Sequence, residues 1–524
     1  MTERRTQHSD HKNHGSRLRL LALCSLLLCS LLGVVLAYPK VLFNPKPNHS
    51  FACFVGLTEC SNVPVRGKWR EDFAAVRERF RRNFEEFDEV GAAVVVYVNG
   101  EKVVDLWAGV AKPSEDGSGY DEWRKDTLVN VFSTGKGVAN LCIAKLVADG
   151  RLDYDTAVAY YWPEFAQEGK ENITLGQLLR HEAGLAVIDD PLYDDLTFLQ
   201  EATTSTELGD LLAKQKPNWK VTEGVHGYHA ISRDFFLSQL IRRVDVKGRG
   251  MDEFFREEIA EPFGIDFHFR LDEKHHHRTA QLVPRPKLWA AIESLSPYLF
   301  EEQFWGSEFF NELMDSSSLS YGAFTRPTAL NGAMNLAMYD TTEIRSLEAP
   351  SCAGIGSADG LAKLYHLVAL GSSSSSFLPP SLNSSSSFGF SKSLQELLLE
   401  ETKPVKFSKD VILKSEAAFT RGGWVKLKPD WHVIGSCGYG GSLAFADLDR
   451  RMSFAYVMNM MGAVDPQELW LDKRAMALVE SVYQVLEEND KQKAPLSEKE
   501  ATRTTKTKIQ MAVSGMERDS WMRL

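Results

Sequence analysis

Ser133 and Lys136 are spaced so that they could perform acyl-transfer chemistry, because they stand directly before the apolar run Val138 to Ala148. The length and flanks of that run predict a buried helix, and residues three apart share one helix face. A serine hydroxyl needs a base near neutral pH, and a desolvated lysine can lose its proton and serve. Such a spacing also arises by chance, so an ordinary helix start is the competing interpretation.

Other motifs are incomplete. The string Ser133 to Gly137 is not a phosphate-binding loop, because Asn130 replaces the leading glycine and Gly137 replaces the final Ser or Thr. His181 is followed by Glu but not by the second His of a zinc-protease helix, and no G-x-S-x-G elbow occurs. The polar run His275 to His277 is typical of a solvated loop. No metal or cofactor is expected.

The context of Ser133 favours catalysis. The stretch Val131 to Leu185, VFSTGKGVANLCIAKLVADGRLDYDTAVAYYWPEFAQEGKENITLGQLLRHEAGL, resembles the serine β-lactamase and penicillin-binding-protein superfamily, in particular its class C-like esterase branch. The likeness continues through GYHA at Gly227 and GGSLAFAD at Gly440, and covers most of residues 70 to 485. Eukaryotic β-lactamase-domain-containing proteins with an N-terminal membrane segment are the most similar overall. The resemblance implies an α+β sandwich of the β-lactamase/transpeptidase type.

This resemblance implies roles for single residues. Ser133 would be the acylated nucleophile, Lys136 its proton acceptor, and Tyr228 the phenol that passes the proton to the leaving group. Ala230 stands where the family's Y-x-N motif has Asn.

The family's third motif aligns with Ser436-Cys437-Gly438. Gly438 lets the strand lie close to the substrate, and the backbone N–H groups of Tyr439 and Ser133 would stabilise an oxyanion. Ser436 replaces the cationic or imidazole residue that helps bind a substrate carboxylate, which argues against β-lactamase activity. Cys437 is a strand thiol, a kind more often inert than reactive.

Both ends of the chain carry the elements that would position these residues. Asn99-Gly100 predicts a hairpin between strands 92–98 and 102–107, and strands are expected at 442–446 and 452–459. Helices are predicted at residues 73–87 and 468–486, the first from apolar residues at steps of three and four. These elements indicate one mixed antiparallel sheet flanked by helices, with a mostly helical lobe inserted between residues 126 and 370.

The N-terminal region predicts a membrane location. Residues 1–19 form a basic cytosolic segment, and Leu20 to Tyr38 contain no charge, which indicates a signal-anchor with the catalytic part lumenal or extracellular. A signal peptide cleaved near Ala37 is the alternative. A stalk at 39–67, a hydrolase domain at 68–488 and a disordered tail at 489–524 would follow. Glycosylation acceptor patterns begin at Asn48, Asn172 and Asn383, and Cys53 and Cys60 could form a bridge.

Composition narrows the class of function. The 524 residues are 44% hydrophobic and carry a net charge of −11, which excludes a disordered or collagen-like chain and argues against a nucleic-acid partner. The expected function is a serine hydrolase that cleaves a small-molecule ester or a peptide. Two alternatives are a catalytically silent binding or scaffold protein, favoured by Ala230 and Ser436, and a filament-forming peptidase.

Overall fold

The computed structural model describes residues 63–493 except for 88, 115–118, 222–223, 285–305, 332–334, 371–390, 404, 430 and 463–470. All of its helices and strands belong to one compact unit. The segments predicted at 1–19, 20–38 and most of the stalk lie outside the described residues, as do Asn48, Asn383, Cys53 and Cys60.

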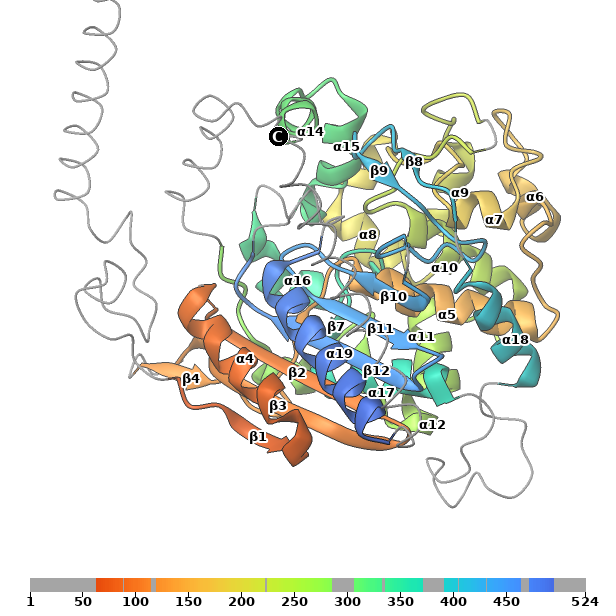
Figure 1. The fold of residues 1–524 in the computed structure, drawn as a ribbon. Coiled ribbons are helices and arrows are strands. Elements are labelled where there is room, and N and C mark those ends of the chain that lie inside the picture. The colour runs from red at the N-terminus through yellow and green to blue at the C-terminus, as the bar shows by residue number, and fades with distance from the viewer. Residues whose placement is uncertain are drawn as a thin grey trace, which may run out of the picture. The chain divides into compact units, whose positions relative to one another are not determined.

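An antiparallel sheet built from both ends of the chain forms the centre of the fold (Figure 1). Its strand order is β1-β3-β2-β12-β11-β10, and β4 pairs with β3. Asn99 and Gly100 both have positive φ, the backbone that a two-residue hairpin turn requires between β2 and β3. The strands are β1 Arg66–Trp69, β2 Gly91–Val98, β3 Glu101–Pro113, β4 Tyr120–Glu122, β10 Val433–Cys437, β11 Leu443–Asp447 and β12 Met452–Met458.

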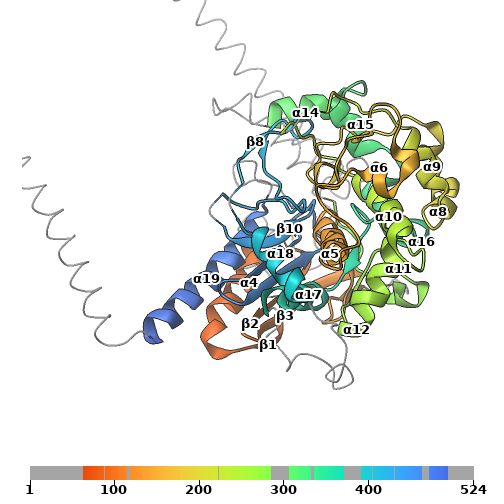
Figure 2. The same cartoon turned by 90° about the vertical axis from the view of Figure 1, so that its right-hand side faces the viewer.

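Helices cover both faces of the sheet. On β2, Val94 and Val96 belong to the apolar cluster that includes α4 (Ala74–Glu86) and α19 (Lys473–Lys493). Val95 and Tyr97 point the other way, into the cluster that includes α5 (Thr134–Ala148) and α17 (Ala358–Leu370). Because side chains alternate along a strand that is buried on both faces, the sheet has a core layer on each side. Figure 2 shows α4 and α19 on the side opposite α10 (Arg233–Val244) and α12 (Glu261–Phe263).

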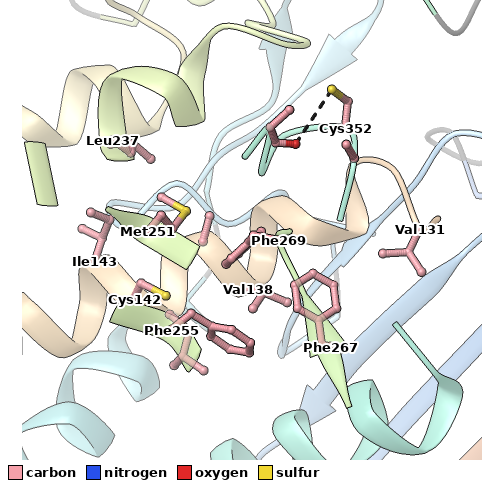
Figure 3. Close-up of a cluster of buried hydrophobic side chains, with 14 of the residues drawn as sticks. Val131, Val138, Cys142, Ile143, Leu237, Met251, Phe255, Phe267, Phe269 and Cys352 are labelled. Carbon is pink, nitrogen blue, oxygen red and sulfur yellow. Dashed lines mark hydrogen bonds between the residues drawn. The ribbon is translucent and has the colours of Figure 1, made fainter. Parts of the chain in front are cut away.

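The segment between β5 (Val129–Asn130) and α17 forms the predicted helical lobe. A small antiparallel sheet in the order β5, β7 (Ile355–Gly356) and β6 (Phe267–His268) is added to it. Its core is apolar around the start of α5, where Val138, Cys142, Phe255 and Phe267 meet (Figure 3). Because α5 is buried on nearly all sides, it is fixed against both the lobe and the sheet. The helices are α6 Val158–Tyr161, α7 Leu175–Leu179, α8 Leu196–Ala202, α9 Glu207–Lys214, α10 Arg233–Val244, α11 Met251–Phe255, α12 Glu261–Phe263, α14 Gly306–Met314, α15 Leu319–Thr325 and α16 Thr342–Arg345, and α18 Lys392–Glu400 follows α17.

Shorter elements complete the described chain. The helix predicted at 73–87 is preceded by a 3-10 turn, and the last helix continues past residue 488 to Lys493. The small strands are β5 Val129–Asn130, β6 Phe267–His268, β7 Ile355–Gly356, β8 Ser408–Lys409 and β9 Glu416–Ala417. The 3-10 helices are Glu71–Phe73, Pro163–Phe165, Pro191–Asp194, Glu273–Arg278, Thr328–Leu330 and Leu336–Asp340, and Arg256–Ala260 is a π-helical turn.

Within the described ranges, no helix is both long and apolar enough to cross a membrane. The apolar helix α5 has 15 residues, about 22 Å at 1.5 Å per residue, whereas a bilayer core measures about 30 Å. The longer helix α19 carries charged residues along its length. This finding corrects the prediction of a membrane or secretory-pathway protein, whether anchored through Leu20 to Tyr38 or cleaved near Ala37, and neither location is retained.

Candidate active site

Ser133 lies at the N-terminus of α5, immediately after a strained residue. Phe132 has φ +47, a conformation uncommon for a bulky residue, and its N–H donates to Asn130 Oδ1 at 2.8 Å. Thr134, which follows Ser133, places its hydroxyl 3.0 Å from that of Ser442, the residue immediately before β11. The sharp turn at Phe132 thus presents Ser133 between the lobe and the sheet.

Lys136 reaches back to Ser133 from one turn along α5. Its Nζ lies 3.3 Å from Ser133 Oγ and donates to the backbone carbonyls of Ala230, at 2.6 Å, and Ser351, at 2.8 Å. Burial lowers the pKa of Lys136 from 10.5 to about 7, opposed by the nearby Asp234 carboxylate and assisted by Arg233. A substantial fraction of this lysine is therefore neutral at pH 7 and able to accept a proton.

Tyr228 contacts both Ser133 and Lys136. Its hydroxyl donates to Ser133 Oγ at 2.8 Å, and its ring lies 5.0 Å from Lys136 Nζ. Burial raises the pKa of Tyr228, so the phenol keeps its proton. The structure therefore brings together the three residues that the sequence predicts as catalytic, and places a proton donor and a potential proton acceptor on one hydroxyl.

The other three predicted site residues lie at the end of β10, the edge strand nearest α5. Ser436 is buried, and its hydroxyl donates to the carbonyl of Ser133 at 2.9 Å. A side chain at Gly438 would lie 2.1 Å from the carbonyl oxygen of Val131, so this close approach requires glycine. Tyr439 is half exposed, and its ring packs edge-on against that of Phe132.

Among the described residues, the backbone N–H groups of Ser133 and Tyr439 have no hydrogen-bond acceptor. The N–H of Gly438 is occupied, because it donates to Ser442 at 2.8 Å and closes the turn that carries Tyr439. Both predicted oxyanion donors are thus left available in the wall of one cavity.

A cavity opens onto Ser133 and has a predominantly apolar wall. Its two cations are Lys136 and Arg233, and Arg233 Nε is paired with the carboxylate of Asp234 at 2.6 Å. The lining therefore offers no cation free to bind a substrate carboxylate. The other lining residues are Asn140, His181, Phe324, Leu413, Ala417, Phe419, Gly423, Val425 and Cys437, together with the remaining predicted site residues.

His181 and Asp410, which the sequence analysis did not identify as functional, bind the backbone around Tyr228. The N–H of Gly227 donates to the carbonyl of His181, and the N–H of His229 donates to His181 Nδ1, each at 3.0 Å. The N–H of Tyr228 donates to Asp410 Oδ1 at 3.1 Å. No fixed spacing connects these residues along the chain, and the unusual φ of +63 at His181 has no clear sequence signal.

Metal ligation has no support in the described ranges, where no group of three or more His, Cys, Asp or Glu side chains is arranged to hold an ion. The triple histidine run forms part of a 3-10 helix without any buried residue. Cys437 also lines the cavity, where burial raises the pKa of its thiol to about 11 and so disfavours the thiolate.

Comparison with known proteins assigns the family. The Beta-lactamase family model matches residues 80–477. The esterase/beta-lactamase LipL of Mycobacterium tuberculosis (strain ATCC 25618 / H37Rv) is 34% identical over 197 residues, which make up 37% of this chain and 42% of LipL. The match thus spans less than half the length of this curated relative.

Solved structures match over a longer part of the chain. A family VIII carboxylesterase is 28% identical with a TM-score of 0.62, over 80% of this chain and 100% of that one. A penicillin-binding-protein homologue from Caulobacter crescentus is 30% identical with a TM-score of 0.58 and the same two coverages. Because the family model matches well over half of the sequence, this chain belongs to the beta-lactamase family.

Proposed function

We propose that this protein is a serine hydrolase that cleaves an ester or amide bond through an acyl-Ser133 intermediate. The observation that carries the proposal is the pair of contacts at Ser133 Oγ, with Lys136 Nζ at 3.3 Å and Tyr228 OH at 2.8 Å. A serine hydroxyl with a base and a phenol donor beside it has the proton path that acyl transfer needs. The relatives that are esterases support the same reaction class.

The reaction would run in two balanced halves. Neutral Lys136 takes the proton of Ser133 as Oγ attacks the substrate carbonyl, and the N–H groups of Ser133 and Tyr439 stabilise the resulting oxyanion. Tyr228 donates its proton to the departing oxygen or nitrogen and regains one from Lys136. Water then attacks the carbonyl of the acyl-enzyme, and one of its protons passes to Lys136. Ser133 Oγ departs from the acyl group and takes its proton back from Lys136.

The cavity favours an uncharged substrate. Its wall is predominantly apolar, and both lysine and arginine are committed to groups of the protein. A substrate carboxylate would therefore be desolvated without a partner, at a cost of several kcal/mol. The neutral Ser436 adds no compensating charge. We infer that neutral esters of small molecules are preferred over β-lactams that carry a carboxylate.

Labelling of the purified protein with a fluorophosphonate probe tests the proposal. Wild-type protein is expected to be labelled at Ser133 and to hydrolyse p-nitrophenyl esters, and Ser133→Ala to do neither. Ser453→Ala is the matched control, because this buried serine on β12 donates to the carbonyl of Ala362 away from the cavity. Wild-type protein that is folded but neither labelled nor active would instead support a catalytically silent binding protein.

A further inference from the structure

Asp410 connects the proton-transfer residue Tyr228 with the wall of the cavity. Its side chain is fully buried, and Oδ1 accepts three backbone N–H groups. Two of them, from Ile412 and Leu413 at 2.8 Å each, belong to the turn that Asp410 itself begins. The third, from Tyr228 at 3.1 Å, comes from a segment far away in the sequence. One oxygen atom therefore fixes two parts of the site.

Further contacts hold the same two segments together. The N–H of Val411 donates to the carbonyl of His226 at 3.0 Å, and Gly227 is so close to Val411 that a Cβ there would lie 2.5 Å from its side chain. Leu413, whose N–H is bound by Asp410, lines the cavity. A displacement of the Asp410 turn would therefore move Tyr228 and the Leu413 wall at the same time.

We propose that Asp410 is a positioning residue that sets both the proton transfer through Tyr228 and the selectivity of the cavity for the acyl group. A local cap of its own turn would require only the bonds to Ile412 and Leu413. The additional bond to Tyr228 has the geometry to hold the phenol at 2.8 Å from Ser133 Oγ. Misplacement of a reacting group by about 1 Å lowers rates by about 100-fold. This inference rests on the function proposed above.

Three substitutions separate positioning from local capping. Asp410→Asn keeps an acceptor oxygen for all three N–H groups. Asp410→Ser keeps a hydroxyl one bond shorter, which can cap the local turn but falls short of Tyr228. Asp410→Ala removes the acceptor. Asp195→Ala is the matched control, because this carboxylate caps the two N–H groups of Thr197 and Phe198 at the start of α8.

The kinetic constants for p-nitrophenyl acetate and octanoate provide the test, after folding has been verified by circular dichroism. For Asp410→Ser and Asp410→Ala we expect kcat to fall about 10- to 100-fold and the octanoate-to-acetate ratio of kcat/KM to change at least about threefold. Asp410→Asn and the Asp195 control should stay within about threefold of wild type. Should the alanine variant fail to fold, the serine variant decides.

Two results would overturn the proposal: folded Asp410→Ser with wild-type kcat and selectivity, or Asp410→Asn as impaired as the serine variant. Failure of the proposed function is recognised separately, because the fluorophosphonate probe would then not label Ser133 in wild-type protein. Labelled wild-type protein with unaffected Asp410 variants would refute only the role of Asp410.

Discussion

Lowering the pH from 8 to 6 should slow acylation about tenfold, because it protonates Lys136. Burial lowers the pKa of this lysine to about 7. Only the neutral amine accepts a proton from Ser133, and its fraction rises with pH, from about one in eleven at pH 6 to about ten in eleven at pH 8. The value of kcat/KM for a neutral ester is therefore expected to rise with pH, with a midpoint near 7.

Stopped-flow or steady-state hydrolysis of p-nitrophenyl butyrate between pH 5.5 and 9 measures this rise of kcat/KM with pH. Burial also raises the pKa of Asp410 to about 6, so substitutions are needed to assign the rise to Lys136. Lys136→Arg places a permanent cation beside Ser133 and should lower kcat/KM about 100- to 10,000-fold while removing the midpoint. Lys145→Arg, near the C-terminal end of α5 and outside the cavity lining, is the control. A flat wild-type profile, or an unchanged midpoint in Lys136→Arg, would refute the assignment of Lys136 as the base.

Three further substitutions test the site and the fold. Tyr228→Phe removes the donor 2.8 Å from Ser133 Oγ, and kcat should fall about 100- to 10,000-fold with little change in KM; an intact kcat would exclude the phenol from proton transfer. Gly438→Ala places a Cβ 2.1 Å from the carbonyl of Val131, so fluorophosphonate labelling should slow at least about tenfold, whereas an unchanged rate would show that the turn can shift freely. Phe80→Ala empties a fully buried position between α4 and the sheet and should lower the free energy of unfolding in urea by about 3–5 kcal/mol. Its kcat should stay near wild type in dilute buffer, and a loss below about 1 kcal/mol would contradict the packing of α4.

Local patterns predicted most of the framework. The steps of three and four residues at Val76, Phe80 and Phe84 mark the buried face of α4, and Asn99-Gly100 marks the β2–β3 turn, because both signals depend on neighbours in the sequence. The grouping of Lys136 and Tyr228 with Ser133 is predicted by resemblance to a family, since Tyr228 lies far along the chain from Ser133. The structure places Lys136 Nζ and Tyr228 OH beside Ser133 Oγ.

The contributions of His181 and Asp410 could not be predicted in the same way. Each acts through hydrogen bonds to the backbone around Tyr228, and such bonds impose no fixed spacing and little restriction on residue type. The sequence also does not predict the apolar character of the cavity, because Phe324 on α15 lies far along the chain from Phe419 and Val425, which pair with each other in one loop. The prediction of a membrane location rested on the hydropathy of Leu20 to Tyr38, which lie outside the described residues. No helix of the described residues is long and apolar enough to cross a membrane.

The pairing of β2 with β12 governs when this protein can finish folding. Val98 lies opposite Met452, so β2, whose other edge pairs with β3, obtains its second sheet neighbour only after residue 452 has been synthesised. At about 5–20 residues per second, the ribosome leaves the free edge of β2 uncovered for roughly 20–70 s. During that time an apolar strand with unpaired N–H and C=O groups can pair with other chains. Heterologous expression should therefore yield more soluble protein when a chaperone that binds unfolded chains is co-expressed than when it is not.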